Sequence, residues 1–249
     1  MKQFSLLFLF LSLICAQTTG NEFGKISLPL GKVSVKKPKM DNWGRALPGQ
    51  KVFVGDHIRT LSKSRCEITL KTGGKVRIGE HSELELGRAD IKPMEKNYNA
   101  NLKKGNIWVS AKAAFGEKKN VSVRTPTAVA AIRGTKYRAA ADSAESSVLI
   151  YEGVVDVNAA KNVAEPQGKG EKDTQKGKPK FKLGPVEEVG APTEVPGPYE
   201  VSLEDWIKLA EGWQINVRKD GKYSLFEFDK TADGELDFVK WNKEQDAKE

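Results

Sequence analysis

The stretch RCEITLKTGGKVRI, residues 65–78, decides the fold expected for this chain. Apolar and polar residues alternate at positions 66–70 and again at positions 75–78. Such alternation places the apolar side chains on one face of a strand. Gly73-Gly74 separates the two runs and supplies the positive φ angles that a tight hairpin turn demands. We predict an antiparallel hairpin in which Cys66 is a small core residue, in preference to a reactive thiol.

Short alternating runs of the same kind recur from residue 31 to residue 158, divided by clusters of Gly, Asp, Asn and Ser. No long helical period interrupts them, which is typical of all-β proteins. The chain is therefore predicted to be mainly β, with a β-sandwich or short β-solenoid-like domain over residues 24–160. Residues 128–132 are apolar without alternation, and we interpret them as a buried strand in preference to a short helical turn. The other runs lie at residues 32–35, 52–54, 57–61, 84–86, 107–109, 121–124, 136–139, 148–151 and 154–157.

Residues 1–20 have the composition of a secretory signal peptide, with Lys2 before an apolar run that is too short to span a bilayer. Cleavage after Ala16 or Gly20 would remove Cys15 and leave a periplasmic or secreted protein with a single thiol. No internal disulfide is then available to stabilise the fold. The rival interpretation, less favoured, treats Cys15 as a lipidated N-terminus.

The order of short motifs along the chain resembles that of the FecR domain family, over about half of the sequence. The motifs are GKVSV (31–35), PG (48–49), VGDHIRT (54–60), Ser64, ITL (68–70), Gly73-Gly74, VRI (76–78), residues 102–109 with Gly105, VRTPTA (123–128), IRGTKY (132–137) and residues 148–157 with YEG (151–153).

The resemblance implies an exported, stand-alone FecR-domain protein. A signal peptide stands where the family's signalling regulators carry a sigma-factor-binding domain and a membrane span, so direct control of a sigma factor is in doubt. In the family the motif positions are structural and imply no active site. They are Gly55, Asp56, Thr125, Pro126, Arg133, Gly134, Thr135, Tyr151 and Gly153.

The composition changes between residues 161 and 198, which contain six Gly and six Pro with thinly spread large apolar residues. This composition predicts a linker. Residues 181–189 alternate closely enough to dock as a strand, so the linker is expected to be partly docked on the β domain.

Residues 199–249 are predicted to form a small helix–hairpin–helix module that packs on the β domain. Ser202 is a capping residue for a helix expected at residues 203–213. Asp220-Gly221 is a strong hairpin signal, and a last helix is expected at residues 236–245. So small a core is marginal by itself, which favours packing against the larger domain.

The chain carries no recognisable catalytic, metal or cofactor signature. His57 and His81 stand in a β run or a turn, without the neighbours that nucleophilic catalysis requires. Residues 229–237 imitate the start of a calcium-binding loop, but its twelfth position is Lys240, where calcium requires a bidentate Glu. We therefore expect no catalytic residue, no metal, no cofactor and no enzymatic activity.

The formal net charge of +8 favours acidic partners, and export argues against nucleic acid. The leading hypothesis is a non-enzymatic protein, not integral to the membrane, that binds another envelope protein through strand edges or an apolar groove. One alternative is a structural subunit of an envelope assembly, such as a periplasmic filament sheath or scaffold. Another is a binder of cell-wall polymer or polysaccharide that uses Lys with an exposed Trp43 or Trp108.

Overall fold

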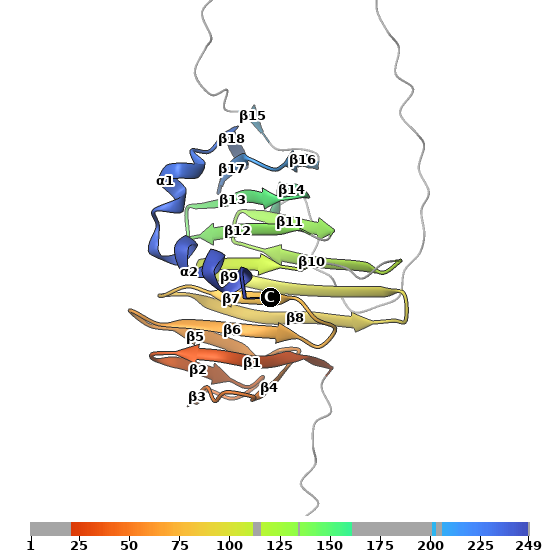
Figure 1. Cartoon of the computed structure of the whole chain (residues 1–249), viewed down its shortest axis with the longest axis vertical. Helices are drawn as coiled ribbons and strands as arrows, with labels where there is room; N and C mark the ends of the chain where they lie inside the picture. Colours follow the sequence, from red (N-terminus) through yellow and green to blue (C-terminus); the bar gives the residue numbers. More distant parts are fainter. Residues whose placement is uncertain (1–20, 112–115, 134, 161–200, 203–205, 249) are drawn as a thin grey trace, which may run out of the picture.

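A computed structural model describes residues 21–111, 116–133, 135–160, 201–202 and 206–248 (Figure 1). The predicted signal peptide, the linker at residues 161–198 with its docking segment, and the motif residue Gly134 lie outside these ranges.

The prediction of a mainly β fold is confirmed, because the strands form two sheets whose inner faces share one hydrophobic core. Sheet A runs in the order β4 (Lys51–Phe53), β1 (Glu22–Leu30), β6 (Arg65–Leu70), β7 (Lys75–Ile78), β9 (Glu95–Ser110), β12 (Lys136–Ala141), β13 (Glu145–Glu152), β17 (Trp213–Arg218), β18 (Lys222–Glu227) and β15 (Val201–Ser202). Sheet B runs in the order β3 (Trp43–Arg45), β2 (Val33–Lys36), β5 (His57–Thr60), β8 (Glu83–Ile91), β9, β10 (Lys118–Arg124), β11 (Ala128–Arg133), β14 (Val154–Ala159) and β16 (Ile207–Ala210).

Strand β9 belongs to both sheets and joins them. Its first part, up to Lys104, pairs with β8 in sheet B, and its last part, from Gly105, pairs with β12 in sheet A. Gly105 has a φ of 94°, a conformation that favours glycine. The backbone N–H of the next residue, Asn106, donates to Ser82 Oγ at 3.0 Å. This hydrogen bond fixes the point where the strand changes sheet.

The hairpin predicted from residues 65–78 is confirmed as β6 and β7, with Ile68 opposite Val76. Cys66, Ile68 and Ile78 are fully buried, as their alternation predicts. The buried strand expected at residues 128–132 is also confirmed, since β11 lies between β10 and β14.

The helix predicted for residues 203–213 is wrong. Residues 207–210 form β16, which pairs with β14 so that Leu209 lies opposite Val155. Ile207 and Leu209 are two positions apart, a spacing that fits a strand, and the hydrogen bonds offered by β14 outweigh helix propensity here. Trp206, immediately before β16, is 47% exposed.

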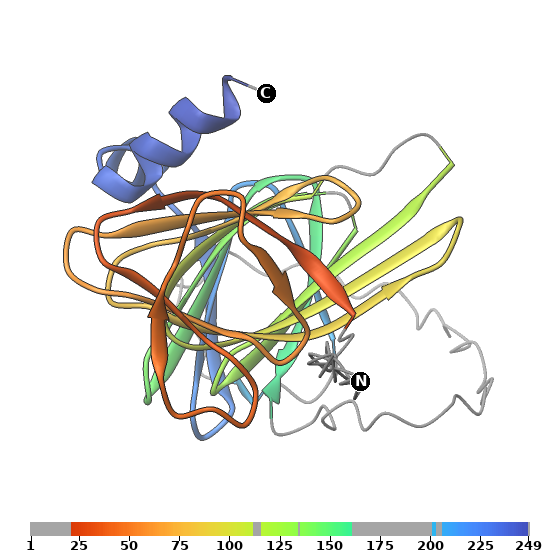
Figure 2. The same cartoon turned by 90° about the horizontal axis from the view of Figure 1, so that it is seen from below.

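The rest of the C-terminal module follows the prediction and extends both sheets. The hairpin is confirmed as β17 and β18, and β17 pairs with β13. The last helix is confirmed as α2 (Asp237–Asp246), and a short helix α1 (Lys230–Gly234) precedes it. Both helices stand outside the layers of strands (Figures 1 and 2). Among the described residues, no helix has the length and apolar character needed to cross a bilayer.

Candidate functional site

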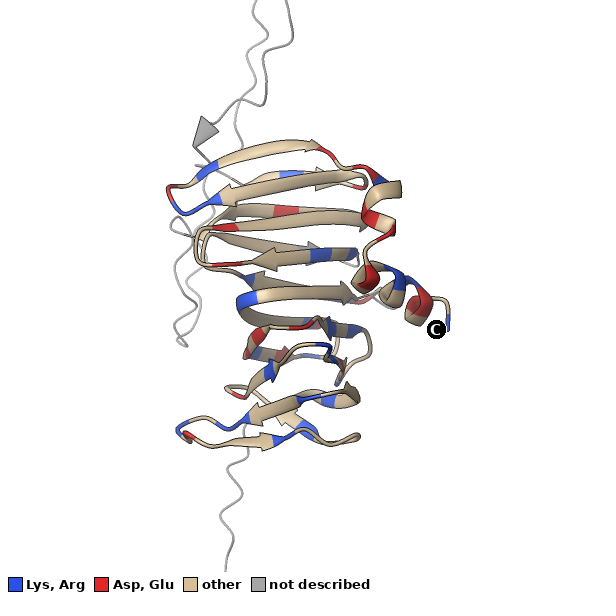
Figure 3. Cartoon of the chain, turned by 90° about the vertical axis from the view of Figure 1, so that its left-hand side faces the viewer, with Lys and Arg blue, Asp and Glu red and all other residues tan. Residues whose placement is uncertain are grey.

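The positive charge of the chain is concentrated at one end of the stack of strands. Residues 21–65 contain ten Lys and Arg against three Asp and Glu, a net charge of +7, whereas residues 66–249 contain 30 of each. Strands β2 to β5 and their loops, residues 32–61, are called the cationic end below. They lie at the lower tip of the molecule in Figures 1 and 3.

Trp43 contacts two cations at the cationic end. The guanidinium carbon of Arg59 lies 3.9 Å from the centroid of the indole ring, and Lys36 Nζ lies 5.5 Å from it. Register explains the Lys36 contact, because Lys36 is paired with Trp43. Arg59 lies on the next strand, two positions from His57, which is paired with Lys36 on its other side. Cation–π contacts of this kind fix the ring and keep both charges at the surface.

The loop between β2 and β3 is anchored by two of the family-motif residues. Asp56 is fully buried and its carboxylate accepts from Lys37 Nζ at 2.7 Å. Gly55 has a φ of 88°, and a Cβ there would lie 2.9 Å from Pro38 Cγ. Gly55 and Asp56 therefore shape the loop that presents Lys39, itself at a φ of 61°.

The cationic end also exposes apolar side chains and strand edges. Met40 and Leu47 are both more than half exposed, and Leu61 is nearly so. In the described part of the chain, β3 pairs only with β2 and β4 only with β1, so each has one open edge. An open edge offers unpaired backbone donors and acceptors to an added strand.

His57 adds no charge to this surface at neutral pH. Partial burial lowers the pKa of His57; Glu85 opposes the shift, and Lys103 and Lys36 reinforce it. The positive potential therefore comes from Lys and Arg alone above about pH 6.5.

The remaining motif residues lie elsewhere, and the structure does not gather them into one site. Thr125 closes the turn between β10 and β11, where its Oγ1 accepts from Ala128 N at 2.8 Å; the exposed Pro126 follows it. Thr135 contacts Gly153, whose φ of 87° and close approach leave no room for a Cβ. The backbone of Arg133 lies in β11.

Tyr151 lies on the outer face of sheet A. Its hydroxyl accepts from Arg138 Nε at 3.1 Å and donates to the buried carboxylate of Asp233. Asp233 belongs to the segment that imitates a calcium loop, and here it is committed to Arg138 and Tyr151. Among the described residues, no group of three His, Cys, Asp or Glu is placed to hold a metal ion.

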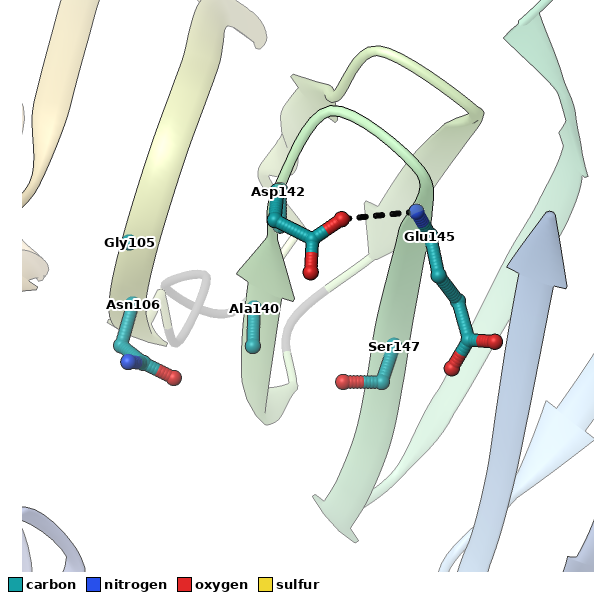
Figure 4. Close-up of a pocket in the computed structure, with 7 residues that line it drawn as sticks. Gly105, Asn106, Ala140, Asp142, Glu145 and Ser147 are labelled. Atoms are coloured by element: carbon teal, nitrogen blue, oxygen red, sulfur yellow. Dashed lines mark hydrogen bonds between the residues drawn. The ribbon is translucent and has the colours of Figure 1, made fainter. Parts of the chain in front are cut away.

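An open cavity of about 270 Å³ lies where β9, β12 and β13 meet (Figure 4). Its polar side chains come from Asn106, Asp142, Glu145 and Ser147. Asp142 caps the turn by accepting from the backbone N–H groups of Glu145 and Ala144, which lowers the pKa of its carboxyl group. Among the residues that line this cavity, Ser147 has no His or Lys beside it to act as its base.

Trp108 is not a surface residue, contrary to the wall-binding hypothesis. It is 1% exposed and stacks against Tyr151, with ring centroids 4.3 Å apart. Trp108 pairs with Arg77 and Arg138 on sheet A, and the C-terminal end of α2 lies beside it. Trp43 is thus the tryptophan available at the β domain's surface.

Cys66 is a core residue, as predicted. Burial, reinforced by the charge of Glu67, raises the pKa of its thiol to about 12. We expect a thiol-specific reagent at pH 8 to label Cys66 about 1,000-fold more slowly in the folded protein than in urea, because only the thiolate reacts. Labelling rates within tenfold of each other would contradict this assignment.

Comparison with known proteins gives two matches of different kinds. Residues 56–156 match the family model described as FecR protein. No curated protein sequence matches the chain. Two crystal structures of a candidate anti-sigma factor from Parabacteroides distasonis ATCC 8503, at 1.65 and 2.50 Å resolution, are similar at 14% identity with a TM-score of 0.44. The match covers 70% of this chain and 60% of each of those chains.

Proposed function

Residues 56–156 of this chain match the FecR family model, and from this premise we propose that the protein is a non-enzymatic, exported binding protein of the cell envelope. Its partner is another envelope protein, which it engages through the cationic end. The FecR family is generally non-enzymatic, which supports a binding role. The composition of residues 1–20 supports export to the periplasm or beyond.

The proposal depends on one observation: open strand edges, exposed apolar side chains and an excess of positive charge all lie at the cationic end. Open edges on β3 and β4 offer backbone hydrogen bonds. Met40 and Leu47 offer exposed apolar area beside them. The excess of Lys and Arg selects an acidic partner and speeds its approach. An extended acidic segment that adds to the edge of β3 satisfies all three properties.

Charge reversal tests this surface. The variant Lys32→Glu, Lys39→Glu, Arg45→Glu changes three exposed cations at the cationic end. The partner is first identified by crosslinking the wild type in the native envelope. We expect the variant to capture this partner about tenfold less well than the wild type does, since each exposed charge contributes about 0.5 kcal/mol. Capture by the wild type should also weaken as NaCl rises from 50 to 500 mM.

The matched control is Lys104→Glu, Lys208→Glu, Lys219→Glu, which makes the same charge change at exposed positions outside the cationic end. It should capture the partner as the wild type does. Equal losses in both triple variants would overturn the assignment to the cationic end. Retention of the protein on purified wall material, with no saturable protein partner, would show that the partner is a wall polymer and not a protein.

A further inference from the structure

The outer face of sheet A carries an unusual row of side chains across three adjacent strands. Arg77 on β7 pairs with Trp108 on β9, which pairs with Arg138 on β12. These three residues are called the acid-binding row. Neighbouring strands are about 4.8 Å apart, so the Cα atoms of Arg77 and Arg138 lie roughly 10 Å apart, with Trp108 on the strand between them.

Each arginine of the row is held in place by the sheet itself. Arg77 Nε donates to Glu67 Oε2 at 2.7 Å, and Arg138 Nε donates to the Tyr151 hydroxyl at 3.1 Å. Glu67 in turn accepts from Lys75 at 2.7 Å. The row is therefore preorganised to receive carboxylates from outside the sheet.

Two carboxylates of the chain's own C-terminal segment occupy the row. Asp246, at the end of α2, pairs with Arg77, and Asp233, in α1, pairs with Arg138. Lys136 lies 3.7 Å from Asp246 and adds a further cation. Residues 229–248 are called the clasp. They bring acidic groups to a cationic face, and this charge complementarity holds them there.

The clasp fits the row incompletely. Only Val239, Trp241 and Asn242 of α2 are buried. Trp108 Nε1 is buried without an acceptor, and Asn242 Oδ1 without a donor, among the described residues. A cavity of about 320 Å³ remains between α2 and the sheet, beside Trp108 and Lys136. Few apolar contacts and imperfect polar pairing are properties of segments that open locally at low cost.

We propose that the acid-binding row is a second docking surface, closed by the clasp, and that an acidic helical segment of a partner protein displaces the clasp and places its own two carboxylates on Arg77 and Arg138. The sheet keeps Glu67 and Tyr151 as partners of these arginines when the clasp leaves. Because the row lies on sheet A and not in the cationic end, it stands or falls independently of the function proposed above.

Hydrogen exchange on the full mature chain tests whether the clasp opens by itself. Backbone amides of residues 237–246 should exchange about 100-fold faster than those of β7, β9 and β12, and faster still at 500 mM than at 50 mM NaCl. If these amides exchange as slowly as those of the sheet, the clasp opens only on global unfolding and the proposal is overturned.

A synthetic peptide of residues 229–248 then serves as the acidic helical probe. The full chain carrying Asp233→Asn and Asp246→Asn should bind it at least about tenfold more tightly than the wild type does, because its internal competitor is weakened. The same peptide with both aspartates changed to asparagine should bind at least about tenfold more weakly to that variant.

Three results of the peptide experiment would overturn the proposed docking surface on the acid-binding row. A folded variant that does not bind the peptide, or that binds both peptides equally, overturns the proposal. A variant that has lost its β-sheet circular dichroism also overturns it, since the sheet must persist without the clasp. The charge reversals at residues 32, 39 and 45 should leave peptide binding unchanged, which separates this site from the cationic end.

Discussion

Gly105→Ala is expected to lower the free energy of unfolding by roughly 3 kcal/mol. Alanine must adopt a φ of 94°, which costs about 1–2 kcal/mol for an L-residue. Its Cβ would also lie 2.5 Å from Ser82 Cα and closer still to Ser82 Oγ, with backbone that cannot move aside. The strain falls where β9 changes sheet, so relief by local movement would separate sheet A from sheet B. Urea unfolding followed by circular dichroism measures the loss.

Gly49→Ala is the matched control. Gly49 also has a positive φ, of 78°, but a Cβ there meets nothing within 4 Å. Gly49→Ala should lower the free energy of unfolding only by the cost of placing alanine at a positive φ, about 1 kcal/mol. If the two variants lose equal stability, the close approach of Ser82 is not what makes glycine necessary at residue 105.

Alternation of large apolar residues was sufficient to find most of the strands. The hairpin of β6 and β7 and the hairpin of β17 and β18 have both a clear period of two and a glycine turn, and both form as predicted. Such local signals act over a few residues and do not depend on the rest of the fold.

The first half of β9 was not predicted, although it is one of the longest elements. Tyr98, Ala100 and Leu102 alternate toward the core, but asparagine occupies the intervening positions. Asparagine is typical of turns, and alanine contributes little to an apolar pattern. Pairing with β8 on one side and β10 on the other stabilises this strand, and neither partner is visible in the local sequence.

The candidate site was predictable only in part. The excess of Lys and Arg before residue 66 can be read from the sequence, and Trp43 was named as a surface aromatic. That β3 and β4 form open edges follows from strand order, which no local pattern specifies. The acid-binding row was missed because Arg77, Trp108 and Arg138 are far apart in sequence, and register alone brings them into line.

Arg77→Met is expected to destabilise the protein by about 3 kcal/mol, because it leaves the buried carboxylate of Glu67 with Lys75 in place of two cations, whereas the clasp can carry Asp246 out to solvent. The Arg77 side chain is 0% exposed, and those of Glu67 and Asp246 are 7% and 8% exposed. Lys240→Met is the control on α2: its pair with Glu235 is largely exposed, so the change should stay within about 0.5 kcal/mol. Equal effects on the urea midpoint would show that burial does not strengthen the Arg77 network.

The same network should make stability fall in acid. Burial works to raise the pKa of Glu67, but hydrogen bonds from Arg77, Lys75 and Ser27 outweigh it and leave that pKa below its usual value of 4.5. A carboxyl group whose pKa is lower in the folded state stabilises fully above the unfolded-state pKa, and this contribution is lost as pH falls through the folded-state value. Urea unfolding of the wild type should therefore show declining stability below about pH 4.5, and Glu67→Gln should have a shallower decline because its side chain cannot titrate. An equally steep acid limb in Glu67→Gln would assign the loss to other carboxylates.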